Sequence, residues 1–242
     1  MSRNKENRYK ELENFINKLG LKLKNLENLD IALTHSSYVK ENNLQDVEFN
    51  ERLEFLGDSI IKSCSSEYLY KRFPNYSEGE LSNIRSILVS DQQLEKYART
   101  FNLGFYLKLG LNEENQGGRT RGSNLACAFE AFIGALYLDI GIKEVYDILK
   151  NFYINDVVEI EKNIVKYNAK AALQEYTQSI DKTLPEYKLV KTEGQPHQRV
   201  FTTEVYYQNK QLAIGTGLSK KESEQNAALQ ACIALGLYND KK

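Results

Sequence analysis

Asn50-Glu-Arg-Leu-Glu-Phe-Leu-Gly-Asp-Ser-Ile-Ile61 places two acidic residues inside an apolar run. Glu54 and Asp58 are four residues apart, so on a helix they stack on one face, one turn from each other. Burying a carboxylate costs several kcal/mol unless a cation offsets its charge. The pattern therefore predicts one of two arrangements: two ordinary acids on a solvated helix face, or a buried acidic pair that binds a divalent metal ion.

A second segment, Leu125-Ala-Cys-Ala-Phe-Glu-Ala-Phe-Ile-Gly-Ala-Leu-Tyr-Leu138, is almost continuously apolar and has Glu130 as its only charge. Because it is too short for a membrane span, it predicts a buried core helix. A lone carboxylate in such a helix needs a partner. One interpretation is an ion pair with an arginine such as Arg52 or Arg85. The other is a metal site shared with the first acidic pair, and oxygen ligands of this kind suit Mg²⁺, with Mn²⁺ as a substitute.

The composition sets the broad class of the protein. A chain of 242 residues has room for one domain with a substantial core and a small second domain, and its net charge of −1 gives no support to nucleic-acid binding overall. Cys64, Cys127 and Cys232 lie far apart without metal-type spacing, which indicates reduced thiols in a cytoplasmic protein. The first residues contain no apolar signal region, so we expect no membrane association.

Apolar residues recur at helical spacing through the first two thirds of the chain, which predicts an all-α domain. No segment before residue 168 has the period of a strand, and Gly104–Gly122 is expected to be a loop. The expected helices are Tyr9–Leu19, Leu29–Leu33, Asn50–Tyr70, Ser82–Thr100, Ser123–Leu138 and Ile142–Lys162, with Asn75, Ser82 and Ser123 as capping residues.

A different pattern, helix–strand–strand–strand–helix, follows a boundary near Ile164–Asn168. We therefore predict domains at residues 8–150 and 168–238, joined by a helical end and linker at residues 151–167. The expected elements of the second domain are a helix at Ala169–Ile180, strands at Glu186–Glu193, Phe201–Tyr207 and Leu212–Thr216, and a closing helix at Ser219–Leu237.

These segments resemble the bacterial ribonuclease III family over essentially the whole chain. Asn50–Ser59 is close to the signature of that family, and Leu125–Asp139 resembles its second acidic helix. The resemblance implies an all-α endonuclease domain followed by a small α+β (α-β-β-β-α) double-stranded RNA-binding domain. The other matching stretches are Leu33-Thr-His-Ser-Ser-Tyr38, Glu78-Gly-Glu-Leu-Ser82 with Arg85, Gly117-Gly-Arg119, Leu173-Gln-Glu175, Gln195-Pro-His197 and Gly215-Thr-Gly-Leu-Ser-Lys-Lys221.

The resemblance also implies a function: a double-stranded-RNA-specific endoribonuclease that acts as a homodimer on ribosomal and other structured precursors. Products with 5′-phosphate and 3′-hydroxyl ends are expected, from a metal-dependent displacement. Glu54, Asp58 and Glu130 are the expected metal ligands, with Asp58 and Glu130 as catalytic residues. The expected contacts between subunits lie on the signature helix, at Phe55, Leu56 and Gly57.

The chain departs from the family at one acidic position, where Cys127 stands in place of the third of four acids. A thiol is neutral below about pH 8.5 and is a poor ligand for Mg²⁺, so metal affinity is expected to fall. Cys127 could also be a small buried apolar residue with no role at the site. Two functions therefore stay open: a weakened endonuclease, or a double-stranded RNA-binding protein that has lost cutting.

The second domain offers contacts for a duplex. A-form RNA has a wide minor groove lined by 2′-hydroxyls and a narrow major groove flanked by phosphates. Polar side chains on the first helix and the first inter-strand loop can reach two minor grooves, and lysines at the start of the last helix add charge to its positive end. The expected RNA-binding residues are, in that order, Gln174, Glu175, His197, Lys220 and Lys221, together with Arg119 and Arg121 of the first domain as phosphate-binding residues.

Overall fold

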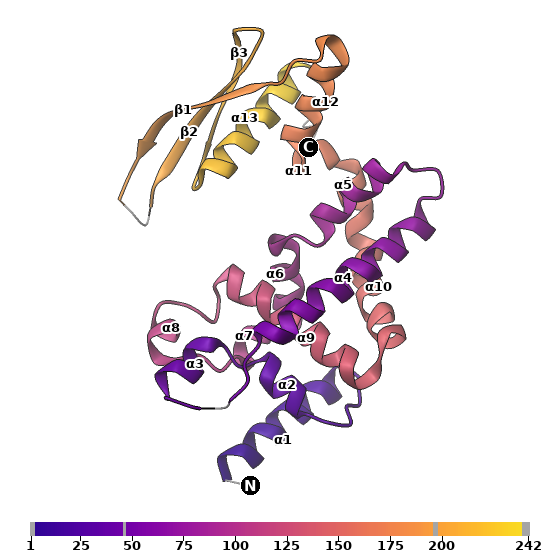
Figure 1. Cartoon of the computed structure of the whole chain (residues 1–242), viewed down its shortest axis with the longest axis vertical. Coiled ribbons are helices and arrows are strands. Elements are labelled where there is room, and N and C mark those ends of the chain that lie inside the picture. The colour runs from indigo at the N-terminus through magenta and orange to yellow at the C-terminus, as the bar shows by residue number, and fades with distance from the viewer. Residues whose placement is uncertain (1–2, 46, 196–197, 239–242) are drawn as a thin grey trace. The chain divides into compact units, whose positions relative to one another are not determined.

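The structure is a computed structural model of the 242-residue chain, and it describes residues 3–45, 47–195 and 198–238 (Figure 1). The chain divides into two compact units between Val158 and Glu159, a point that lies inside helix α10. The helices of the first part are α1 (Arg3–Lys18), α2 (Glu27–Ala32), α3 (Ser36–Glu41), α4 (Glu51–Arg72), α5 (Glu78–Leu88), α6 (Asp91–Thr100), α7 (Leu103–Tyr106), α8 (Leu111–Asn115), α9 (Gly122–Ile140) and α10 (Ile142–Lys162).

Helix α9 forms the centre of the first unit and packs against α2, α4 and α6. Its apolar side chains are buried, and Phe129 and Phe132 pack on the rings of Tyr97 and Phe101. By length and composition α9 could also cross a membrane, but 56% of its most apolar stretch is buried inside the unit. It is therefore the core helix that the sequence predicts.

Helices α4 and α9 cross at two glycines, and this contact fixes the position of the acidic residues. A β carbon added to Gly57 would overlap the carbonyl oxygen of Glu130, and one added to Gly134 would overlap the carbonyl oxygen of Leu53. Glycine is therefore required where the two backbones approach each other. The prediction of Gly57 as a contact between subunits is wrong, because this residue is buried against α9 of its own chain.

The segment Leu33–Tyr38 holds the beginning of α4 in place. The amide of Asn50, the residue before α4, donates to the carbonyl oxygen of Thr34 at 2.9 Å. Thr34 forms an isolated parallel bridge with Lys108, whose amide donates to the carbonyl oxygen of Leu33 at 2.8 Å. This motif therefore has a structural role, since it joins the start of the signature helix to the segment after α7.

The predicted helix Ser82–Thr100 is two helices in the structure. Helix α5 ends at Leu88, and Ser90 begins α6 by accepting a hydrogen bond from the amide of Gln93. A local cap of this kind is favourable enough to interrupt a continuous apolar pattern. The predicted capping residues are also wrong: Ser77 caps α5, whereas Asn75, Ser82 and Ser123 lie before or inside helices. The predicted loop Gly104–Gly122 contains the short helix α8 and part of α7.

The second unit contains α11 (Ile164–Tyr167), α12 (Ala169–Asp181), β1 (Glu186–Glu193), β2 (Val200–Tyr207), β3 (Lys210–Gly217) and α13 (Lys220–Ala234). The strands form an antiparallel sheet in the order β1-β2-β3. Gln208 and Asn209 turn the second hairpin with positive φ, as two-residue turns require. The helices pack on the sheet through a small core that includes Leu173, Val205 and Cys232. The predicted fold class, all-α followed by α-β-β-β-α, is confirmed.

Candidate active site and RNA-binding residues

Glu130 is a half-buried acid on α9 beside the acidic face of α4. Burial and, after it, the negative charges of Asp58, Glu54 and Asp91 raise the pKa of its carboxyl group to about 7, against a smaller lowering by Lys62. Within the part of the chain that the structure describes, no side chain forms a hydrogen bond or ion pair with this carboxylate. Glu130 is therefore partly protonated at neutral pH, and its charged form has no hydrogen-bonded partner among the described residues at the α4–α9 crossing.

The arginines that could have balanced Glu130 are engaged elsewhere. Arg52 forms an ion pair with Glu48 on the solvent side, at 2.6 Å. Arg85 donates to the hydroxyl oxygens of Ser66 and Ser82, at 2.9 and 3.3 Å. The interpretation of Glu130 as one half of an ion pair with either arginine is therefore wrong.

Glu54 and Asp58, both on α4, have different surroundings. Asp58 forms an exposed ion pair with Lys62, one turn further along the helix, at 2.8 Å. Glu54 lies next to Cys127, and burial together with the charge and hydrogen bonding of Glu54 raises the pKa of the Cys127 thiol to about 12. The thiol is therefore protonated at neutral pH and adds no negative charge where the family has an acid.

The structure brings Glu54, Asp58, Cys127 and Glu130 into one neighbourhood. The charges of Glu54 and Glu130 raise the pKa of Cys127, and those of Glu54 and Asp58 raise the pKa of Glu130. Among the described residues, however, no three His, Cys, Asp or Glu side chains converge tightly enough to hold one ion. The donor set itself fits a hard divalent cation, since Glu54, Asp58 and Glu130 offer carboxylate oxygens. The ligation geometry thus remains a prediction.

Two charged residues of this neighbourhood were missed by reasoning from the sequence. Lys62 follows Asp58 by four residues, a spacing that predicts an ion pair on a helix. Asp91 opens α6 and influences both Cys127 and Glu130, although it lies far from them in sequence. The only local signal for Asp91 was its place after a serine, which is typical of a helix start.

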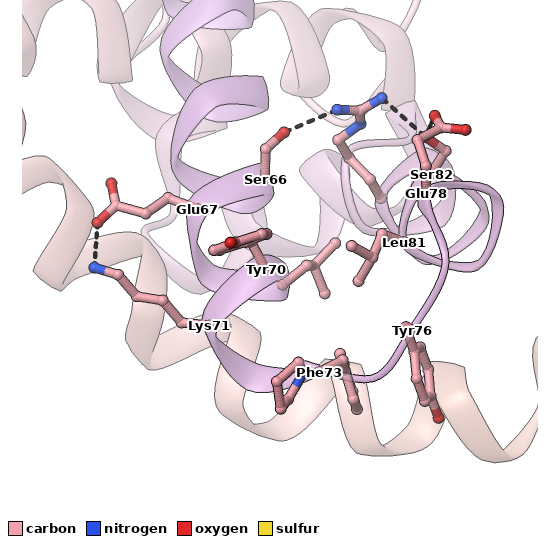
Figure 2. A pocket seen from close by; sticks show the side chains of 12 residues that line it. Ser66, Glu67, Tyr70, Lys71, Phe73, Tyr76, Glu78, Leu81 and Ser82 are labelled. Carbon is pink, nitrogen blue, oxygen red and sulfur yellow. Dashed lines mark hydrogen bonds and ion pairs between the residues drawn. The ribbon is translucent and has the colours of Figure 1, made fainter.

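A cavity of about 790 Å³ lies beside the second half of α4, and Glu54, Asp58 and Glu130 are not among its lining residues (Figure 2). Figure 2 shows Tyr70 and Leu81 in its wall. Arg85 also lines the cavity and joins the two helices by donating to Ser66 of α4 and Ser82 of α5. The family stretch Glu78–Ser82 thus lines this cavity through Glu78, Leu81 and Ser82. Its visible role is to join α5 to α4.

The predicted RNA-binding residues of the second unit lie on its surface. Gln174 and Glu175 are exposed on α12, while Leu173 beside them is buried. Lys220 and Lys221 are exposed in the first turn of α13, and no described residue forms an ion pair with either lysine. Ser219 caps this helix by accepting from the amide of Glu222 at 3.1 Å. His197 lies outside the described residues.

Arg119 and Arg121 are held within the loop that precedes α9. Arg119 forms an ion pair with Glu114 and donates through one terminal nitrogen to three carbonyl oxygens, those of Gly104, Phe105 and Leu107. Arg121 forms an ion pair with Glu113. Only the second terminal nitrogen of Arg119 is left for the predicted phosphate contact. The visible role of the Arg119 side chain is structural, because it ties the loop together.

The nuclease unit of the chain is similar to one known family. Residues 25–157 match the family described as ribonuclease-III-like. Ribonuclease 3 of Clostridium tetani is 46% identical over 226 residues, which cover 93% of this chain and 95% of that protein. The chain belongs to the ribonuclease III family. Ribonuclease 3 of Staphylococcus epidermidis is 43% identical to this ribonuclease III over 213 residues, covering 88% of this chain and 86% of that protein.

Both domains of this ribonuclease III have known relatives. Residues 169–235 match the double-stranded RNA binding motif. A solved structure of the nuclease domain of ribonuclease III from Campylobacter jejuni aligns with a TM-score of 0.53 at 35% identity, covering 58% of this chain and 94% of that one. The chain is therefore a ribonuclease III-type endoribonuclease with a double-stranded RNA-binding domain.

Proposed function

We propose that this ribonuclease III cuts double-stranded RNA with divalent metal ions, Mg²⁺ or Mn²⁺ in its place, held by Glu54, Asp58 and Glu130. The observation that carries the proposal is the half-buried Glu130, which has two neighbouring acids from α4 and no described cation partner of its own. When bound, such ions lower the pKa of a water molecule and stabilise the leaving 3′ oxygen. Asp58 and Glu130 are the catalytic residues, and the products carry 5′-phosphate and 3′-hydroxyl ends.

The second domain holds the duplex in this proposal. Gln174 and Glu175 present an amide and a carboxylate to the 2′-hydroxyls of a minor groove, and the exposed Lys220 and Lys221 contact phosphates across the neighbouring major groove. His197 stays the predicted contact to a second minor groove. Arg119 adds a phosphate contact only through its remaining terminal nitrogen.

The proposed enzyme is a homodimer. The solved structure from Campylobacter jejuni is described as showing structural flexibility in the region involved in dimer formation of its nuclease domain. In this chain the large apolar ring of Phe55 is 78% exposed on α4 and is free to pack against a partner. Phe55 and the half-buried Leu56 are therefore the proposed contacts between subunits.

The substrates are ribosomal and other structured RNA precursors, and the location is the cytoplasm, which agrees with three free cysteines. The functional boundaries are residues 8–150 for the catalytic domain, 151–167 for the linker and 168–238 for the RNA-binding domain.

A cleavage assay on a labelled perfect duplex with Mg²⁺ or Mn²⁺ tests the proposed function. The wild-type protein is expected to cut, and Cys127→Asp is expected to cut faster, because it adds the acid that the family has at this position. Glu130→Gln is expected to abolish cutting while the affinity for the same duplex is kept. Loss of RNA binding in Glu130→Gln would contradict this separation of the two domains.

A second function is favoured by one observation, the neutral thiol of Cys127 at a family acidic position. In that case the protein binds duplex RNA without cutting it. The same assay distinguishes the two functions: a wild-type protein that binds but never cuts, beside a Cys127→Asp variant that cuts, identifies the binding protein. Equal cutting by both would show that the third family acid is dispensable here.

A further inference from the structure

The cavity of Figure 2 lies between one face of α4 and one face of α5. On α4 it is lined by Ser66 and Tyr70, which are one turn apart, and Phe73 lines it just after the end of that helix. In Figure 2 the Tyr70 side chain lies between those of Ser66 and Phe73. A volume of about 790 Å³ lies within the range of about 300–1,000 Å³ that is typical of small-molecule sites. The lining residues of α5 recur at helical spacing and are Glu78, Leu81, Ser82 and Arg85.

Arg85 is a half-buried cation in the wall of this cavity. Its two terminal nitrogens donate to the hydroxyl oxygens of Ser66 and Ser82, at 2.9 and 3.3 Å, and no acid among the described residues forms an ion pair with it. Hydroxyl groups orient the guanidinium without neutralising its charge, and they leave several of its N–H groups unused. The exposed Glu78 accepts from Ser82 at 2.7 Å, and Lys71, the other cation of the lining, pairs with an acid one turn away. Arg85 is therefore held in place to bind an anion that enters the cavity.

Aromatic rings line the same cavity. Tyr70 is 74% exposed, so its ring is open to a ligand, and the rings of Phe73 and Tyr76 stack with their centroids 4.6 Å apart. Nucleic-acid bases stack on aromatic side chains, and guanidinium groups bind phosphate oxygens in pairs. An exposed ring and an oriented guanidinium in one cavity are therefore complementary to a nucleotide.

We propose that this cavity binds an unpaired nucleotide, with its base on Tyr70 and its phosphate on Arg85. A base inside a duplex is stacked between its neighbours and would have to leave the stack to reach a protein ring, so the site selects nucleotides that are not paired. Two sources offer this chemistry: a free mononucleotide, and a single-stranded extension of an RNA duplex. The proposal goes beyond the proposed function, which concerns the duplex itself.

The base contact is tested by titration calorimetry of the full-length protein with adenosine 5′-monophosphate, in the absence of divalent ions. Tyr70→Ser removes the ring from an exposed position and is expected to weaken binding about tenfold. Tyr70→Phe keeps the ring and is the matched control, expected to bind within about twofold of wild type.

The phosphate contact is tested with adenosine, which lacks the phosphate. Wild type is expected to bind adenosine at least about tenfold more weakly than the monophosphate, and Arg85→Gln is expected to abolish this difference. Arg52→Gln removes the same charge elsewhere on α4, outside the cavity, and is expected to keep the difference. Because Arg85 also joins α4 to α5, thermal melting followed by circular dichroism accompanies this variant. If Arg85→Gln does not fold, Tyr70→Ser decides.

The source of the nucleotide is identified by fluorescence anisotropy with two RNA duplexes, one blunt and one with a short unpaired extension. If the RNA end is the source, wild type binds the extended duplex about tenfold more tightly than the blunt one, and Tyr70→Ser removes that difference. The site is overturned if wild type binds no monophosphate at up to about 1 mM and binds both duplexes equally. It is also overturned if Tyr70→Ser binds as wild type does in both assays. Neither assay contains a divalent ion, so a protein that binds the nucleotide but cuts no RNA keeps this site while the proposed function falls.

Discussion

Gly57 of α4 lies directly against the backbone of Glu130 in α9, so close that a β carbon at residue 57 would overlap the Glu130 carbonyl oxygen. Backbone atoms on both sides cannot yield as a flexible side chain could. We expect Gly57→Ala to lower the free energy of unfolding of the nuclease unit by about 2 kcal/mol or more, as in other overpacked sites. Urea unfolding followed by circular dichroism measures this change.

Gly79→Ala is the matched control for this prediction. Gly79 lies in the first turn of α5, where an added β carbon meets no atom within 4 Å. Alanine has a higher helix propensity than glycine, so this control is expected to be neutral or slightly stabilising. An unchanged urea midpoint for Gly57→Ala would show that the two helices are further apart than the structure has them.

The acids of the site and the elements of the second domain were predictable because each depends on a short pattern. Glu54, Asp58 and Glu130 interrupt apolar helical runs, and such interruptions stand out without any knowledge of packing. Alternation predicted the strands of the second unit to within two residues of Val200–Tyr207 and Lys210–Gly217. In both cases the cause of the structure lies within a few neighbouring residues.

The rest depends on competition between signals or on contacts distant in sequence. The apolar pattern through Ser82–Thr100 favours one continuous helix. The structure has two helices there, because the Ser90 hydroxyl caps the start of the second one. Without that break the position of Asp91 at a helix start cannot be foreseen. Arg119 resembles a loop arginine free for phosphate, but it bonds to carbonyl oxygens brought near only by the folded chain.

The structural role of Arg119 gives a second prediction. Hydrogen bonds to charged groups contribute about 1.5–3 kcal/mol, and the partial exposure of Arg119 reduces this. We expect Arg119→Met to lower the free energy of unfolding by about 1–2 kcal/mol and to speed hydrogen exchange in the 103–122 segment. Arg121→Met, which removes a more peripheral ion pair with Glu113, is expected to cost about 0.5 kcal/mol. Unchanged stability of Arg119→Met together with weaker duplex binding would instead identify Arg119 as a phosphate contact.

The exposed lysines of α13 lead to a third prediction, about salt dependence. Each phosphate contact adds about 0.9 to the slope of log affinity against log salt, as measured for double-stranded DNA. Replacing Lys220 and Lys221 by alanine is expected to reduce the slope for a duplex RNA by about 2, as measured by fluorescence anisotropy at several salt concentrations. Lys191→Ala on β1 is the control, because this lysine already pairs with Glu193. A slope unchanged by the double substitution would rule out phosphate contacts at the start of α13.

The exposed ring of Phe55 gives the last prediction. Full burial of a phenylalanine side chain is worth about 1.5–3 kcal/mol, and in a two-fold interface the contact occurs twice. We therefore expect Phe55→Ser to weaken dimer formation by about 100-fold or more, measured by sedimentation velocity over a range of protein concentrations. Phe105→Ser is the matched control, since Phe105 is also exposed, at 61%, and lies on the short helix α7 outside the proposed interface. A Phe55→Ser protein that stays dimeric at the same concentrations as wild type would place the contact between subunits on another face of the nuclease unit.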